Sequence, residues 1–91
     1  MYRAKQTRRF ARQYKKLNDN IVKQVDEIIL SVCKNPKIGE QKKGDLVKLF
    51  VVKFYAQNHL YLLGYTIDDL IKLVYLEAIG SHENFYRNVK R

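Results

Sequence analysis

The chain has few of the residues that cross-link or break up a small protein. Its 91 residues include one cysteine, one proline, four glycines and no tryptophan. A single cysteine excludes a disulfide or a cysteine metal cluster within the chain. Cys33 falls on the apolar register of a predicted helix, so we expect a small buried hydrophobe. With 46% hydrophobic residues, the composition predicts a folded chain rather than a disordered one.

Long apolar runs and acidic residues are also scarce. No window reaches about 18 uninterrupted apolar residues, and the basic N-terminus lacks the apolar core of a signal peptide. We therefore expect a cytoplasmic protein without membrane contact. Eighteen Lys and Arg outnumber nine Asp and Glu, so the formal net charge is +9. That excess favours an acidic partner, most often a nucleic acid or an acidic protein, although a solvated basic surface is the simpler alternative.

The first 35 residues predict a strand followed by two helices. Alternation in the first seven residues suits a short edge strand, and Thr7 can cap a helix that buries Phe10, Ala11, Tyr14 and Leu17. Asn18-Asp19-Asn20 ends that helix and starts a second, which Asn35-Pro36 stops. The apolar stripe of the second helix comprises Ile21, Val22, Val25, Ile28, Ile29 and Val32. Two helices with so short a connection predict an antiparallel hairpin.

The remaining residues predict a sheet and a last helix. Residues 36–45 are read as a basic loop, and strands are expected at Leu46–Tyr55, Leu60–Ile67 and Leu70–Ile79. Short turns at 56–59 and 68–69 would make these strands antiparallel neighbours, and a short helix should start near Ser81. The strands are apolar on both faces, so both sides of the sheet should be covered or form a cleft.

The expected fold class is therefore α+β, as one domain over residues 1–91. Its elements are an N-terminal strand, a helical hairpin, a three-stranded antiparallel meander and a short C-terminal helix. A chain of this length suits one hydrophobic core. We expect the helices on one face of an antiparallel sheet.

The segment from Ile79 to Arg91 carries the most distinctive chemistry. Histidine is the residue type that titrates nearest neutral pH, and one stands at position 82, as His82. Tyr86 lies one helical turn further on the same side, and Arg87 can bind phosphate bidentately. Metal-free RNA cleavage needs these abilities: deprotonation of the 2′-OH, in-line positioning, charge neutralisation and protonation of the 5′-oxygen. The structural alternatives are a backbone-bonded histidine, a core aromatic and a solvated arginine.

Two lysines interrupt the first strand of the predicted meander. Because a charge on an apolar strand must reach water or an anion, Lys48 and Lys53 are also candidates. They are five residues apart, so a regular strand would put them on opposite faces. His59 is interpreted as an ordinary turn residue. The nine acids show no spacing typical of a two-metal site, so no metal is expected.

Four segments together carry a resemblance. They are the basic helix Phe10–Leu17, Gly44-Asp45-Leu46 before a strand, Gly64–Asp69 with its Tyr-x-hydrophobic-Asp pattern, and Gly80–Tyr86 with its Gly-x-His start. In this order the chain resembles the RelE/ParE superfamily of toxins from bacterial type II toxin–antitoxin systems. The resemblance extends over essentially the whole chain.

The resemblance implies a function that differs between branches. RelE-like and YafQ-like members are mRNA interferases, which cut mRNA in the ribosomal A site without a metal, whereas ParE-like members poison DNA gyrase. We favour the ribosome-dependent endoribonuclease, which would stop translation. The alternatives are a non-hydrolytic gyrase inhibitor and a small basic RNA-binding module.

The resemblance also implies site residues and partners. The histidine matching His82 is functional in the YafQ-like pattern, and the family strand usually ends in a basic residue near Lys53, so the catalytic candidates are His82, Tyr86, Arg87 and Lys53. The candidates for RNA or ribosome binding are Lys42, Lys43, Lys48, Arg8, Arg9, Arg12, Lys90 and Arg91. No cofactor is implied. The implied partners are the ribosome with mRNA and an acidic, partly disordered antitoxin, which together with the toxin often binds promoter DNA.

Two positions depart from the ribonuclease pattern. Leu62 and Ala78 stand where many ribonuclease members have arginines. Lys53, Arg87, Lys90 and Arg91 would have to replace that positive charge. If they do not, the chain does not cleave RNA as its relatives do, which favours the gyrase alternative.

Overall fold

The computed structural model describes residues 1–46 and 48–89 as a mixed α+β structure, which confirms the predicted fold class. The helices are α1 (Arg8–Lys15), α2 (Asp19–Lys34) and α3 (His82–Val89). The strands are β1 (Arg3–Gln6), β2 (Glu40–Gln41), β3 (Phe50–Ala56), β4 (His59–Asp68) and β5 (Leu73–Ser81). They form one five-stranded sheet in the order β1-β5-β4-β3-β2.

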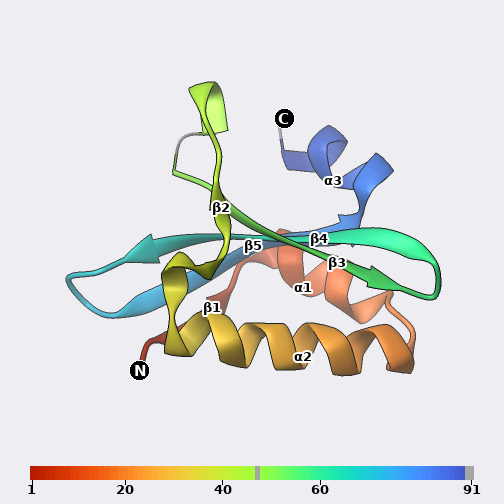
Figure 1. Cartoon of the computed structure of the whole chain (residues 1–91), viewed down its shortest axis with the longest axis horizontal. Coiled ribbons are helices and arrows are strands. Elements are labelled where there is room, and N and C mark those ends of the chain that lie inside the picture. Colours follow the sequence, from red (N-terminus) through yellow and green to blue (C-terminus); the bar gives the residue numbers. More distant parts are fainter. Residues whose placement is uncertain (47, 90–91) are drawn as a thin grey trace.

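The sheet is covered on both faces. Figure 1 shows α1 and α2 on one face and α3 on the other, so the expectation that all helices share one face is wrong for α3. The larger buried cluster includes Phe10 of α1 and Val25 of α2. The smaller cluster lies beneath α3 and comprises Leu49, Val51, Leu62, Ala78 and Phe85. Since the strands are apolar on both faces, each face needs a cover, and α3 covers the second.

The local signals that delimit the first two helices act as predicted. The Thr7 hydroxyl accepts a hydrogen bond from the Phe10 N–H at 3.1 Å, and the Asn18 side chain accepts one from the Ile21 N–H at 3.1 Å. These side chains satisfy backbone donors that have no partner inside the helix. Asn35 ends α2, and Pro36 begins a short 3₁₀ turn.

The sheet is mixed rather than purely antiparallel, because β1 pairs in parallel with β5. β1 pairs only with Leu73–Leu76, and α1 takes over the edge of β5 beyond them. The Gln13 side-chain oxygen accepts from the Ile79 N–H at 2.9 Å, and the Thr7 hydroxyl donates to the Leu76 carbonyl at 3.0 Å. The first helix therefore satisfies part of a strand edge that would otherwise need another strand.

Two predicted strands begin too early. β3 starts at Phe50 rather than Leu46, so Lys48 lies before the strand and not on it. β5 starts at Leu73 rather than Leu70, because Leu70 and Ile71 belong to the β4–β5 turn, where Lys72 has a φ of 57°. The Asp68 carboxylate holds this turn by accepting from the Leu70 N–H at 3.1 Å. Apolar residues in a turn look like strand residues when only hydropathy is considered.

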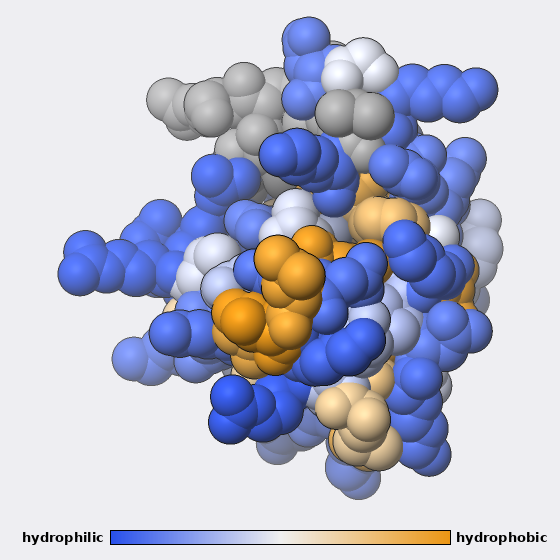
Figure 2. Space-filling model, turned by 90° about the vertical axis from the view of Figure 1, so that its left-hand side faces the viewer, coloured by the Kyte–Doolittle hydropathy of each residue, from blue (hydrophilic) through white to orange (hydrophobic). Residues whose placement is uncertain are grey.

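The tip of the β4–β5 hairpin is exposed and apolar. Leu70 is 95% exposed and Ile71 56% exposed. Figure 2, seen from the end of the molecule where this hairpin lies, shows a compact hydrophobic patch within a largely hydrophilic surface. A prediction from hydropathy assumes that apolar residues are buried, so it wrongly assigns these two exposed residues to a strand.

Tyr65 of β4 holds the segment that joins α2 to β3. Its buried hydroxyl donates to the Pro36 carbonyl at 2.7 Å and accepts from the Gly39 N–H at 2.9 Å. A Cβ at Gly39 would lie 2.6 Å from that hydroxyl, so glycine is needed for this close approach. Residues 36–45, predicted as a loop, therefore contain an ordered connection that includes β2, which the prediction missed.

We expect Tyr65→Phe to destabilise the protein by about 1–3 kcal/mol. The substitution removes the hydroxyl and leaves the Pro36 carbonyl and the Gly39 N–H without their partner. Urea unfolding followed by circular dichroism measures the change in free energy. Tyr55→Phe, at a tyrosine that is 70% exposed, is the matched control and should leave the midpoint unchanged. Equal midpoints for both variants would contradict the role assigned to Tyr65.

Candidate active site

Helix α3 is fixed on the sheet by Phe85, which is 1% exposed. A Cβ at Gly64 would lie 2.6 Å from the end of the Phe85 ring, so the absence of a side chain at Gly64 makes the recess that the ring fills. Leu62 and Ala78 are fully buried in the same cluster. The two positions predicted to depart from the ribonuclease pattern thus form the apolar floor under α3, and a charged side chain there would lose its hydration.

The side of α3 next to Phe85 presents His82 and Tyr86 together, as their four-residue spacing predicts. Their ring centres are 6.0 Å apart in an edge-to-face arrangement, and Tyr86 also packs against Phe85 at 5.1 Å. His82 is exposed and Tyr86 half-buried. Tyr86 therefore packs partly against the core, as the structural alternative proposed, and remains partly exposed beside the imidazole.

Lys42 follows β2 and lies against Tyr86. Its ammonium is 5.5 Å from the centre of the Tyr86 ring and 3.6 Å from a carboxylate oxygen of Glu40. A side-chain hydrogen bond with Tyr86 raises the pKa of Lys42, with a smaller contribution from the Glu40 charge, so the lysine stays cationic. From the sequence, Lys42 was predicted only to bind RNA or the ribosome. Its proximity to Tyr86 depends on the fold, since 44 positions separate the two residues in the chain.

Lys53 lies on the same face of the sheet as α3. It pairs with Leu62 across β3 and β4, and Leu62 pairs with Gly80 across β4 and β5. Because paired residues point to the same face, the buried position of Leu62 beneath α3 assigns Lys53 to that face. Lys53 is exposed at the end of this row, so its charge reaches solvent.

A cavity of about 370 Å³ opens beside His82. It is lined by His59 and Leu60 of β4 and by Ser81, His82 and Glu83 at the start of α3. Ser81 is the last residue of β5 and α3 starts directly after it, so the strand-to-helix junction carries His82 to the rim of the cavity. His59, which was interpreted as an ordinary turn residue, is therefore part of the surroundings of His82.

The other predicted residues are distributed more widely. Arg87 and Lys43 are exposed, and Arg8, Arg9 and Arg12 lie on α1, on the face of the sheet opposite α3. Lys90 and Arg91 lie outside the described residues. The structure therefore brings His82, Tyr86 and Lys42 into one group, with Lys53 on the same face of the sheet, and does not bring the α1 arginines to it.

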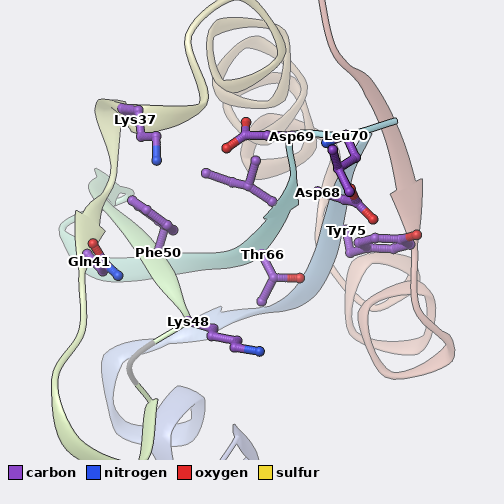
Figure 3. A pocket seen from close by; sticks show the side chains of 10 residues that line it. Lys37, Gln41, Lys48, Phe50, Thr66, Asp68, Asp69, Leu70 and Tyr75 are labelled. Carbon is purple, nitrogen blue, oxygen red and sulfur yellow. The ribbon is translucent and has the colours of Figure 1, made fainter. Parts of the chain in front are cut away.

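Lys48 lines a different pocket. This pocket, of about 530 Å³, also includes Lys37, Phe50, Tyr75, Asp68 and Asp69. Figure 3 shows its lining side chains, with the two carboxylates beside Leu70 of the hairpin. The mixed charge makes it less suited to a polyanion than the surroundings of Tyr86.

Neither a metal site nor a membrane-spanning helix is found among residues 1–46 and 48–89. No group of three or more His, Cys, Asp or Glu side chains in these ranges could hold a metal ion. In the same ranges, none of the helices has the length and apolar character needed to cross a bilayer. Burial raises the pKa of the Cys33 thiol, which keeps it protonated and agrees with the predicted structural role.

Comparison with known proteins places the chain in a family. A family model described as ParE-like toxin of type II bacterial toxin–antitoxin systems matches residues 4–90. The chain belongs to this family. The predicted membership of the RelE/ParE superfamily is thus confirmed. No sequence among curated proteins matches the chain.

Solved structures of RelE toxins share the fold. The toxin of the RelBE2 toxin–antitoxin complex from Mycobacterium tuberculosis has a TM-score of 0.79 at 23% identity, over 89% of this chain and 98% of that one. The isolated RelE toxin of Escherichia coli has a TM-score of 0.75 at 21% identity, over 100% of this chain and 98% of that one. The intact RelBE complex of Escherichia coli has a TM-score of 0.75 at 20% identity, over 88% of this chain and 95% of that one. At these identities the similarity establishes the fold.

Proposed function

We propose that this toxin is a ribosome-dependent, metal-free endoribonuclease that cuts mRNA and thereby inhibits translation. The observation that carries the proposal is the group formed by His82, Tyr86 and Lys42 beside an open cavity, with Lys53 exposed on the same face. It combines an imidazole, an aromatic ring and two cations. These are the functions that cleavage of a phosphodiester without a metal requires.

Each residue has a separate task in this proposal. His82 transfers a proton, and Tyr86 stacks on a base or orients the scissile phosphate. Lys53 and Lys42 neutralise negative charge at the phosphate oxygens, with Arg87 as a further cation on α3. Lys42 takes over part of what arginines at Leu62 and Ala78 would do, because those two positions are buried under Phe85. Lys43, Lys48 and the basic residues of α1 would contact ribosomal or messenger RNA without taking part in the chemistry.

A cognate antitoxin is the second partner in this proposal. The related RelE toxins of Escherichia coli and Mycobacterium tuberculosis were solved in complexes with antitoxins. With a net charge of +9, this toxin suits an acidic, partly disordered antitoxin that covers the basic surface. The toxin–antitoxin complex would bind promoter DNA, with the antitoxin making most of the contact.

The test uses ribosomes programmed with a defined mRNA. Purified toxin is added, new 5′ ends are mapped, and naked mRNA is treated in parallel. We expect cuts at the A-site codon only when ribosomes are present. A folded, growth-inhibiting toxin that makes no cuts would contradict the proposal.

The alternative is a non-hydrolytic inhibitor of DNA gyrase. The apolar floor at Leu62 and Ala78, which lacks the charge of ribonuclease relatives, favours it. In that case, cells expressing the toxin would show DNA damage and filamentation before protein synthesis falls. Measuring both responses after induction separates the two targets.

Gly80 offers a test of where the RNA lies. A Cβ built there meets no atom within 4 Å, so the fold itself does not require a glycine at this position. Gly80 belongs to the row that starts at Lys53 and lies two residues before His82. We expect Gly80→Val to keep the unfolding midpoint, since valine suits a strand, and to lower mRNA cleavage at least about tenfold by obstructing the substrate.

Gly64→Ala is the matched comparison for this variant. Its methyl group would collide with Phe85 and should lower both stability and cleavage. Full activity of Gly80→Val would place the RNA elsewhere.

A further inference from the structure

The two histidines of this chain line the same cavity. His59 comes from the start of β4 and His82 from the start of α3, and 23 positions separate them in the sequence. Leu60, Ser81 and Glu83 are the remaining lining residues. With only two histidines in 91 residues, their meeting in a cavity of about 370 Å³ calls for an explanation beyond an ordinary turn residue.

His59 is held on a well-defined turn. It pairs with Ala56 across the β3–β4 hairpin, and the two residues between them, Gln57 and Asn58, have φ values of 53° and 65°. Two positive φ values are typical of a tight type I′ hairpin. The Gln57 side chain accepts a hydrogen bond from the Asn18 side chain at 3.0 Å, which ties the turn to the start of α2. This bond fixes the turn that precedes His59 against the helix layer.

Both imidazoles are available for a ligand. His59 and His82 are exposed, and within the described part of the chain neither imidazole forms a hydrogen bond or an ion pair. The contact of His82 with the Tyr86 ring leaves its nitrogens unused. A histidine with a structural role commonly spends at least one nitrogen on a fixed partner. The pairing of His59 with Ala56 of the larger cluster directs the His59 side chain to the α1–α2 face, whereas His82 starts α3 on the other face. Two such imidazoles at one cavity can act on opposite sides of a bound phosphodiester.

We propose that His59 is a second catalytic residue, which forms with His82 the general acid–base pair of the cleavage reaction. This inference rests on the proposed ribonuclease function. One neutral imidazole takes the proton of the 2′-OH while O2′ forms a bond to phosphorus. The bond from phosphorus to O5′ breaks, and the other imidazole, which starts as imidazolium, gives its proton to O5′. The products are a 2′,3′-cyclic phosphate and a 5′-hydroxyl. The base has gained the proton of the 2′-OH, and the acid has lost the proton that now lies on O5′.

Charged groups lie on both sides of the pair. Glu83 lines the cavity, and Lys53 lies on the face of the sheet that α3 covers. The other titratable groups around the pair are Tyr86 beside His82, Lys42 beyond Tyr86, and Tyr55, which lies two residues after Lys53 on β3. Tyrosine and lysine ordinarily keep their protonation states near neutral pH, and histidine is the residue type that changes its state there.

The test measures single-turnover cleavage on programmed ribosomes between about pH 5.5 and 8.5, where free histidine titrates. Wild-type toxin should give a bell-shaped rate profile, which reports one acid and one base. His59→Gln should cut about 100-fold more slowly or worse and lose one limb of the bell. His59→Ala should recover activity when imidazole is added, which a merely structural histidine would not allow.

Asn58→Gly is the matched control for these variants. It lies next to His59 at a position with positive φ, where glycine is well tolerated, so the turn is kept and the imidazole untouched. Its rate and profile should match those of wild type, and thermal unfolding should show that all variants are folded.

The possible outcomes distinguish a failure of the proposed histidine pair from a failure of the proposed ribonuclease function. If wild-type toxin cleaves and His59→Gln keeps both limbs of the profile at a nearly unchanged rate, the pair is wrong and the ribonuclease stands. If folded wild-type toxin cuts no mRNA on ribosomes, the proposed function is wrong and the pair is overturned with it. A fall in rate without imidazole rescue and without a changed profile would also overturn the catalytic role of His59.

Discussion

His82→Gln should lower the rate of mRNA cleavage by about 100- to 10,000-fold, the range supplied by a positioned proton-transfer group. Glutamine keeps a polar side chain of similar size but cannot accept and release a proton near neutral pH. The imidazole is exposed and contacts Tyr86 only through its ring, so the fold should not depend on it. Rates are measured on programmed ribosomes, and the unfolding midpoint is measured by urea titration.

Two controls make the result for His82 specific. Lys34→Gln changes a charge at the end of α2, on the face of the sheet opposite α3, and should keep full activity. Growth inhibition in cells should fall with cleavage for His82→Gln, while the protein remains folded. A His82→Gln toxin that is fully active and fully toxic would contradict proton transfer by His82 and would favour gyrase as the target.

Phe85→Ala should release α3 from the sheet. The ring fills the recess over Gly64 and belongs to the small cluster with Leu49, Leu62 and Ala78. Truncation of a buried phenylalanine costs about 3–5 kcal/mol, a large share of the 5–15 kcal/mol that stabilises a typical domain. Because α3 carries both His82 and Tyr86, cleavage should disappear even at temperatures where the rest of the sheet is folded.

Hydrogen exchange distinguishes local release from global unfolding. In Phe85→Ala the amides of α3 should lose protection, while those of β4 should retain most of theirs, since the larger cluster holds the sheet against α1 and α2. Phe85→Leu retains most of the apolar volume and should cost less and keep partial activity. Unchanged protection of α3 in Phe85→Ala would mean that other contacts hold the helix. His82→Gln, in contrast, should lose activity without any loss of protection.

Local sequence signals predicted the helices and the pattern of the sheet. Thr7, Asn18 and Asn35-Pro36 act through neighbouring backbone groups, so their effect can be derived without knowing the fold. Hydropathy also located β3, β4 and β5 but misplaced two of their starts. Lys48 and Leu70 were assigned to strands because hydrophobic runs extend past the residues that pair, and pairing depends on the partner strand.

The candidate site could be predicted only in part. His82 and Tyr86 lie one helical turn apart, and helix geometry alone places them side by side. The roles of Arg87 and Lys53 stay predictions, and the opposite-face argument for Lys48 fails because Lys48 precedes β3. The neighbours of His82 and Tyr86 from distant segments, Lys42 and His59, were missed, since each is brought close by pairing between strands.

The sequence by itself determined the composition of the surface, the elements and the resemblance to a toxin family, because these depend on residue type and short-range spacing. Only the tertiary structure decided which face of the sheet α3 covers, that Leu62 and Ala78 are its floor, and that Lys42 and His59 lie beside the residues of α3. The physical reason is that these features follow from how the apolar sides of separate elements pack on one another. That packing joins residues more than 20 positions apart and leaves no periodic trace in the chain.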